Sequence, residues 1–131
     1  MPRKRIKSIS KKLKGQHILV VEDHPFVGEI LTGLLTLFDR PSHVNSAKDA
    51  LKQIEQKRPD IIVLDLSLPD MNGLEFAKLL RRNRKTRSIP ILAISASRTD
   101  KRKWLEAGCN DFVLKPFSTS TLLTRLSKLA A

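Results

Sequence analysis

Tyrosine is absent from the 131-residue sequence, and cysteine occurs once, at Cys109. A single cysteine excludes an internal disulfide, which fits a reducing compartment. No apolar run is long enough to span a bilayer, and the N-terminus lacks the apolar segment of a secretory signal. We therefore expect a soluble, cytoplasmic protein without membrane insertion. The length and the 40 % hydrophobic content are those of one domain with one core.

Acidic residues are missing from the first fourteen positions, which hold seven of the cations that give the chain its net charge of +12. Such a segment can contact nucleic acid or an acidic partner, or it can be a solvated, solubilising arm. It has no aromatic residue, so we favour the solvated arm and keep weak nucleic-acid or acidic-partner contact through residues 3–14 as the alternative. Because Ile6, Ile9 and Leu13 are spaced by three and four, residues 5–14 can also form a short amphipathic helix.

After residue 15, short apolar runs alternate with segments of helical periodicity. The runs predict strands at 17–21, 40–45, 61–64, 91–94 and 112–114, and the periodic segments predict helices at 25–37, 47–57, 74–82, 99–107 and 118–129. Continuous apolar runs are typical of strands buried on both faces. The alternation predicts an α/β fold, a doubly wound five-stranded parallel sheet with helices on both faces and the flavodoxin-like strand order 2-1-3-4-5. We expect this domain over residues 16–131, preceded by a basic extension over residues 1–15.

The first of these helices has apolar residues at helical spacing, and the fourth contains the chain's only tryptophan. The residues at helical spacing in the first are Phe26, Val27, Ile30, Leu31, Leu34 and Leu37. Trp104 can bind a partner or pack on its own domain. A further group of cations, Arg81, Arg82, Arg84, Lys85 and Arg87, lies at the end of the third helix, where cations are favourable without any binding role.

Polar residues stand at the carboxyl ends of four expected strands: Glu22 and Asp23, Asp65, Ser95 and Lys115. The ends of parallel strands share one edge of a sheet, so we expect these side chains to converge. Three carboxylates in one place need a cation among them, and oxygen ligands suit a hard divalent ion, Mg²⁺ or Mn²⁺. Together with Lys115, such an ion would neutralise an incoming phosphoryl group.

The segments that carry these residues strongly resemble the receiver domain of two-component response regulators, of the stand-alone, single-domain type. They are VVEDHP at 20–25, IIVLDLSLPDMNG at 61–73, ILAISA at 91–96 and AGCNDFVLKPF at 107–117. The resemblance covers about residues 16–130. It implies that Asp65 is the phosphoacceptor, and that Glu22, Asp23, Asp65 and the backbone carbonyl of Ser67 hold the metal.

The same resemblance implies how the phosphorylated state is recognised. Ser95 is the switch hydroxyl, Lys115 the phosphate-binding lysine and Phe112 the switch aromatic. Phe112 lacks the hydroxyl of the commoner tyrosine, and it can equally be a simple core residue. The peptide between Lys115 and Pro116 is expected to be cis.

The implied function is a signalling switch that takes its phosphoryl group from a histidine kinase or a histidine phosphotransfer protein. Phosphorylation would then change the face formed by the fourth helix, fifth strand and fifth helix, which binds a downstream protein. Such a domain is not an enzyme in the usual sense, because it catalyses only its own phosphorylation and dephosphorylation. Of the dimerisation charges on that face, Lys101, Asp111 and Arg125 match, but Ala107 and Thr121 stand where acids are expected, so we expect a monomer or weak dimer.

Two alternatives remain open. One is a pseudo-receiver, a protein-interaction module of the same fold that is never phosphorylated. The other is a hydrolase of the haloacid-dehalogenase type, which also uses an aspartate nucleophile. Those enzymes have a second aspartate two residues after the nucleophile, and here that position is Ser67.

Overall fold

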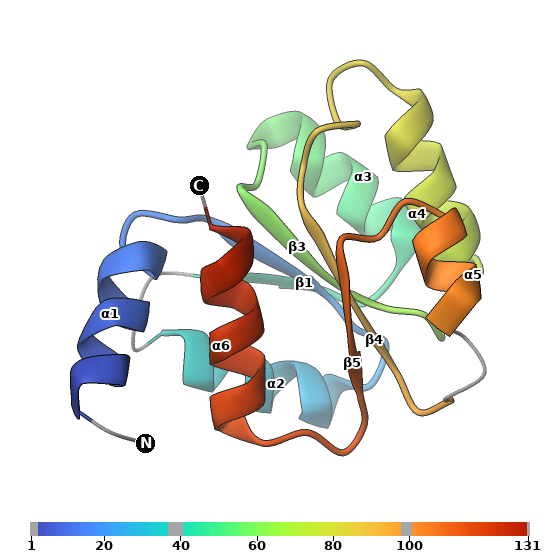
Figure 1. Ribbon diagram of the computed structural model, residues 1–131. Coiled ribbons are helices and arrows are strands. Elements are labelled where there is room, and N and C mark those ends of the chain that lie inside the picture. Colours follow the sequence, from blue (N-terminus) through green and yellow to red (C-terminus); the bar gives the residue numbers. More distant parts are fainter. Residues whose placement is uncertain (1–2, 37–40, 98–100, 131) are drawn as a thin grey trace.

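The computed structural model describes residues 3–36, 41–97 and 101–130 (Figure 1). Within them the chain forms six helices and five strands. In chain order they are α1 (Arg3–Leu13), β1 (Ile18–Val21), α2 (Pro25–Leu35), β2 (Ser42–Val44), α3 (Ala47–Gln56), β3 (Ile61–Asp65), α4 (Gly73–Arg82), β4 (Ile91–Ser95), α5 (Lys101–Glu106), β5 (Asp111–Leu114) and α6 (Thr119–Leu129). No helix in these ranges has the length and apolar character needed to cross a membrane.

All strands pair in parallel in one sheet of order β2-β1-β3-β4-β5, which confirms the predicted topology. Helices α1, α2 and α6 cover one face of this sheet, and α3, α4 and α5 cover the other (Figure 1). The register pairs Asp65 with Ile94 and Ser95 with Leu114. The carboxyl ends of β3, β4 and β5 therefore lie side by side, where polar residues follow them.

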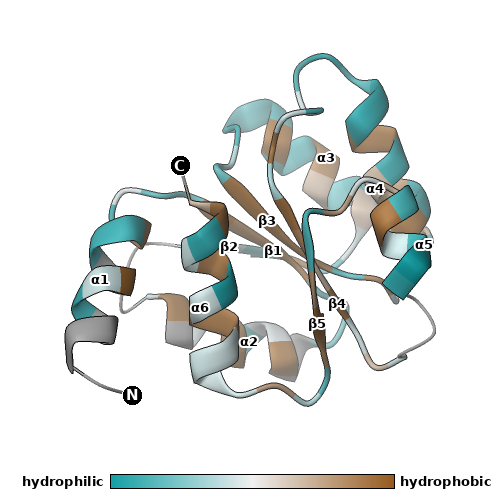
Figure 2. Ribbon diagram, in the orientation of Figure 1, coloured by the Kyte–Doolittle hydropathy of each residue, from teal (hydrophilic) through white to brown (hydrophobic). Residues whose placement is uncertain are grey.

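Each face of the sheet has its own apolar core, because successive strand residues point to opposite sides. Leu19 and Val21 pack with α3, α4 and α5, whereas Ile18 and Val20 pack with α1, α2 and α6. Every residue of β1, β3 and β4 is buried, as expected for strands covered on both faces. The strands accordingly form a brown band between amphipathic helices in Figure 2.

Only some of the apolar residues at helical spacing in α2 face the sheet. Leu31 and Leu35 are 2 % and 1 % exposed, whereas Ile30 is 50 % exposed. A stripe spaced by four residues, from Val27 through Leu31 to Leu35, packs on the core, and Ile30 lies outside it.

Some sequence expectations lie outside the described part of the chain. They concern Leu37, the strand start at Arg40, the helix start at Thr99, and the side chains of Ile6, Phe26 and Leu34.

The basic N-terminal segment forms a helix that packs on the domain. Ile9 and Leu13 of α1 are 3 % and 0 % exposed and join the core shared with α6. The amphipathic helix is confirmed, and the solvated-arm interpretation is wrong for its apolar face. The cations Lys7 and Lys11 are exposed, and Gly15, with φ of 79°, ends the segment in the left-handed region. The domain boundary after residue 15 stays a prediction.

Candidate functional site

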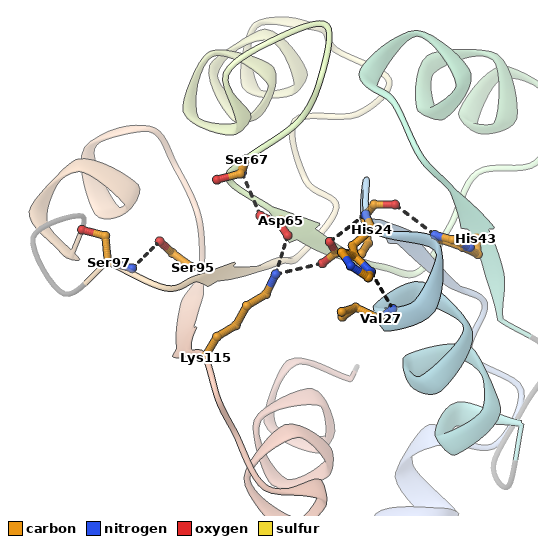
Figure 3. Close-up of polar contacts among 9 residues, drawn as sticks. His24, Val27, His43, Asp65, Ser67, Ser95, Ser97 and Lys115 are labelled. Carbon is orange, nitrogen blue, oxygen red and sulfur yellow. Dashed lines mark hydrogen bonds and ion pairs between the residues drawn. The ribbon is translucent and has the colours of Figure 1, made fainter.

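Three charged side chains from three strand ends meet at the carboxyl edge of the sheet (Figure 3). The Lys115 ammonium Nζ lies 2.6 Å from Asp65 Oδ2 and 3.2 Å from Glu22 Oε2. Glu22 follows β1, Asp65 ends β3 and Lys115 follows β5. The predicted convergence of these side chains is confirmed.

Burial sets the electrostatics of this cluster. The Glu22 and Asp65 residues are 2 % and 4 % exposed. Burial, a hydrogen bond with Asp65 and repulsion by its charge raise the pKa of Glu22 from 4.5 to about 7. Burial alone would lower the pKa of Lys115, but its hydrogen bond to Asp65 and the attraction of both carboxylates raise it. One ammonium group thus faces two buried carboxylates, an arrangement that favours an additional cation.

Backbone hydrogen bonds fix the strand ends beside one another. Leu66 N donates to Ile94 O at 3.0 Å, and Lys115 N donates to Ser95 O at 2.8 Å. Ser67 N donates to Asp65 Oδ1 at 2.7 Å, so the loop after β3 orients the carboxylate. Ser95 is 7 % exposed, and its hydroxyl accepts from Ser97 N at 3.0 Å. The sheet therefore places the Ser95 hydroxyl one strand away from Asp65.

The oxygen donors at this edge are chemically suited to a divalent cation. Glu22 and Asp65 lie within one hydrogen-bonded cluster, and Asp23 is the next residue along the chain. In the described residues, no three His, Cys, Asp or Glu side chains are grouped as a metal site, and Asp23 is exposed. The donor set fits a hard ion such as Mg²⁺ provided that the Asp23 carboxylate and the Ser67 carbonyl complete it.

Gly73 allows α4 to begin against the site. A Cβ atom at Gly73 would lie 2.5 Å from Leu66 Cα and 2.9 Å from Asp65 O. Gly73 N donates to Leu66 O at 3.0 Å, and the Asn72 side chain caps α4 by accepting from Leu74 N. The missing side chain therefore lets the first turn of α4 contact the backbone that carries Asp65.

Asp70, in the same loop, holds the start of α3. Its two carboxylate oxygens accept from Ala47 N and Lys48 N, each at 3.0 Å. These backbone hydrogen bonds lower the pKa of Asp70. Ser46, the N-cap of α3, accepts from Asp49 N, so both side chains satisfy backbone donors of the first turn. Sequence reasoning missed this role because Asp70 acts on a helix that precedes it in the chain.

His43, on the edge strand β2, supports the chain at Glu22. Its Nε2 lies 3.0 Å from the Glu22 carbonyl oxygen, at hydrogen-bonding distance. A Cβ atom at Gly28 would lie 2.2 Å from the His43 ring, so only glycine lets the imidazole approach α2 this closely. No spacing in the sequence indicates this contact, since the two residues meet only in the folded sheet.

The expected switch aromatic, Phe112, stacks on Trp104. The ring centroids are 5.4 Å apart, with 4° between the ring planes. Trp104 is only 6 % exposed, so it packs on its own domain, as one of its two interpretations predicted. Phe112 is partly buried against the core under α3, α4 and α5. The peptide between Lys115 and Pro116 is cis, as expected.

The face formed by α5, β5 and α6 holds a groove of about 510 Å³, with Trp104 and Phe112 in its lining. On this face Arg125 Nη1 pairs with Asp111 Oδ1 at 3.0 Å within the chain. Two of the three matching dimerisation charges thus neutralise each other in one molecule.

Comparison with known proteins identifies the family to which this arrangement corresponds. The sequence model of the response regulator receiver domain matches residues 18–127. The chain is 36 % identical over 115 residues to the phosphate regulon transcriptional regulatory protein PhoB of Klebsiella pneumoniae, covering 86 % of the chain and 50 % of that protein. It is 37 % identical to the alkaline phosphatase synthesis transcriptional regulatory protein SphR of Synechococcus elongatus, covering 88 % and 49 %. The chain therefore spans about half the length of the curated relatives it matches.

Solved structures show the same fold. A putative response regulator from Chloroflexus aurantiacus superposes with a TM-score of 0.85 at 30 % identity, covering 89 % of the chain and 98 % of that structure. The receiver domain of a sensor histidine kinase from Pseudomonas aeruginosa superposes with a TM-score of 0.78 at 31 % identity, covering 88 % and 97 %. That structure holds a magnesium ion coordinated in its active-site cleft.

Proposed function

The chain belongs to the response regulator receiver domain family, and we propose that it is a signalling switch phosphorylated on Asp65. The observation that carries this proposal is the contact of the Lys115 ammonium with the buried Asp65 carboxylate at 2.6 Å. A buried nucleophilic oxygen beside a fixed cation is suited to a reaction in which negative charge accumulates. The magnesium in the Pseudomonas aeruginosa receiver domain supports the same chemistry.

In the proposed reaction an Asp65 carboxylate oxygen attacks the phosphorus of a phosphohistidine on a histidine kinase or phosphotransfer protein. The new P–O bond forms as the P–N bond breaks, and the imidazole nitrogen keeps the electron pair and later takes a proton from solvent. Positioning and charge neutralisation supply most of the catalysis of such transfers. Lys115 offsets charge on the phosphoryl oxygens. Mg²⁺ or Mn²⁺, held by Glu22, Asp23, Asp65 and the Ser67 carbonyl, would supply further neutralisation.

Residues on the neighbouring strands β4 and β5 then respond to the phosphoryl group. The Ser95 hydroxyl donates a hydrogen bond to a phosphoryl oxygen, which draws the loop after β4 toward Asp65. Phe112 turns toward the space that this loop leaves, and the face of α5, β5 and α6 changes shape. Because the phosphoryl group contacts one state better than the other, it shifts an existing equilibrium toward the form that binds a downstream protein.

Incubation with acetyl phosphate and Mg²⁺ tests the proposal. Intact-protein mass spectrometry should detect one added phosphoryl group on the wild type and none on Asp65→Ala. Chelation of the metal should abolish the gain. An unmodified wild type would indicate a pseudo-receiver, and equal modification of Asp65→Ala would overturn the assignment of Asp65 as the phosphoacceptor. Turnover of a phosphate ester beyond one equivalent would indicate a hydrolase.

A further inference from the structure

The sheet edge opposite Asp65 carries a concentration of positive charge. Six cations that are exposed lie where α3 and α4 end, and we call them the basic rim: Lys57, Arg58, Arg82, Arg84, Lys85 and Arg87. Arg58 joins the two loops that carry them, because its Nη2 donates to Ser88 Oγ at 2.9 Å and its Nε to Lys85 O at 3.2 Å. Two basic segments separated in the sequence therefore form one surface. Figure 1 shows α3 and α4 on the same face of the sheet.

An aliphatic floor lies beside the basic rim. Two hollows of about 650 and 710 Å³ share the lining residues Leu51, Glu55 and Asn83. Ile54 completes the apolar lining of the first hollow, and Leu79 that of the second. Leu51 and Leu79 are half-buried, so part of their apolar surface faces the groove. The hollows therefore form one shallow groove with aliphatic side chains below and cations around it, and Glu55 is the one acidic residue among the described residues that line it.

The ends of the two helices account for only one of these charges. Arg82 lies in the last turn of α4, where the helix dipole stabilises a cation, but the last turn of α3 contains no basic residue. Arg84, Lys85 and Arg87 lie beyond α4. Among the described residues, no member of the basic rim forms an ion pair.

Arg81, the neighbour of Arg82, shows the contrast. It donates to the carbonyl oxygens of Gly108, Arg87 and Ile89 and to the Asn110 side chain. Its guanidinium group is used within the fold, as are those of Arg58 and Arg82 in part. Within the described part of the chain, the side chains of the other four rim cations form no hydrogen bond or ion pair and remain available for a partner: Lys57, Arg84, Lys85 and Arg87.

We propose that this groove binds an acidic amphipathic segment of another protein. Its carboxylates would pair with the basic rim, and its apolar side chains would pack on Leu51 and Leu79. Charge complementarity of this kind gives specificity and speeds association. A single-stranded nucleic acid fits less well, because bases stack on aromatic side chains, and none of the residues that line the two hollows is aromatic.

The proposed site is separate from the phosphoryl switch. The strand β3 begins at Ile61, at the edge of the sheet where α3 ends, and reaches Asp65 about 13 Å further along. The proposal therefore goes beyond the phosphorylation chemistry, and Asp65→Ala can be tested for binding alongside the wild type. Loss of phosphorylation alone would leave the groove proposal unaffected.

The test is fluorescence anisotropy with a labelled helical peptide of about 14 residues, with glutamate on one face and leucine on the other. Arg84→Glu combined with Lys85→Glu should weaken binding at least about tenfold, because two attractive charges become repulsive. Lys7→Glu combined with Lys11→Glu makes the same charge change on α1 and should alter binding less than about twofold. Replacing the peptide's leucines with serine should also weaken binding, as the aliphatic floor requires. Circular dichroism melting verifies that each variant folds.

Several results would overturn the proposal. They are absence of peptide binding by the wild type, equal losses in the two double variants, and insensitivity to the leucine replacement. A labelled DNA duplex of similar length serves as the competing ligand. If it binds more tightly than the peptide and loses affinity in the Arg84→Glu and Lys85→Glu variant, the groove is a nucleic-acid surface instead.

Discussion

The two edges of the sheet carry charge in opposite ways. At the carboxyl edge, Glu22 and Asp65 are buried, and the Lys115 ammonium contacts both carboxylates. At the other edge, the cations of the basic rim are exposed and, among the described residues, form no ion pair. Buried charges held by partners within the chain have fixed positions and altered proton affinities, which suit chemistry. Exposed charges without such partners suit recognition.

The energetic costs of the two arrangements differ as well. Two carboxylates withdrawn from water beside one ammonium group are unfavourable unless their hydrogen bonds and a cation compensate. Exposed lysines and arginines cost the fold little, because solvent screens them. Removal of a cation should therefore affect phosphorylation at the carboxyl edge and partner binding at the basic rim.

The largest expected effect comes from Lys115→Met. It removes the cation nearest Asp65, so the initial rate of phosphorylation by acetyl phosphate should fall by about 100-fold or more. Lys85→Met makes the same change at the basic rim and should leave that rate unchanged. Mass spectrometry over a time course measures both rates. Equal phosphorylation rates in the two variants would contradict the claim that only the carboxyl edge of the sheet acts in phosphorylation.

A second prediction concerns α1, whose cations Lys7, Lys11 and Lys12 are exposed like those of the basic rim but whose other face is buried. Leu13 is fully buried, so Leu13→Ala should lower the free energy of unfolding by about 3 kcal/mol. Lys12→Ala, on the exposed side, should change it by less than about 0.5 kcal/mol. Urea denaturation measures both. Similar small changes in the two variants would mean that α1 adds nothing to the core.

Two glycines provide a third contrast, this time in packing. Gly73→Ala places a methyl group against the backbone of Leu66 and should cost about 2 kcal/mol of stability. Gly33, inside α2, has nothing within 4 Å of an added Cβ, so Gly33→Ala should stabilise the chain by about 0.5–1 kcal/mol. Thermal and urea unfolding should show opposite signs. Stabilisation by Gly73→Ala would contradict the close approach of α4 to the site.

The smallest effect is expected at Cys109. Its thiol is buried, and it can be compared with the buried Glu22 and Asp65 carboxylates, which the Lys115 ammonium contacts. Burial raises the pKa of Cys109 to about 11, and the nearby Arg81 charge lowers it only in part. The thiol should stay protonated, and therefore unreactive, from pH 7 to 9 in the folded chain. Iodoacetamide should modify it only in denaturant, as followed by mass spectrometry. Rapid modification of the folded chain would show that Cys109 is accessible.

The sequence was sufficient to predict the fold and the strand ends that meet at the carboxyl edge. The apolar runs that end in Asp65 and Ser95 are buried strands, and parallel pairing brings their ends together. The sequence did not show which apolar residues of α2 face the sheet, because they fit more than one helical stripe. The structure selects Leu35, and it places Ile30 on the surface.

Contacts between segments that are distant in the sequence could not be predicted from the sequence. The two carboxylate oxygens of Asp70 cap the start of α3, at Ala47 and Lys48, more than twenty residues earlier in the chain. Arg58 meets the loop after α4 only because α3 and α4 end at the same edge. Both contacts depend on tertiary geometry, for which local spacing carries no signal.

The central claim is that Asp65 itself carries the phosphoryl group. After treatment with acetyl phosphate and Mg²⁺, borohydride reduction converts an aspartyl phosphate to homoserine, which peptide mass spectrometry can locate. The account predicts homoserine at position 65 and at no other aspartate. Its appearance at Asp23 or Asp70 instead, or its absence from every peptide, would contradict the account.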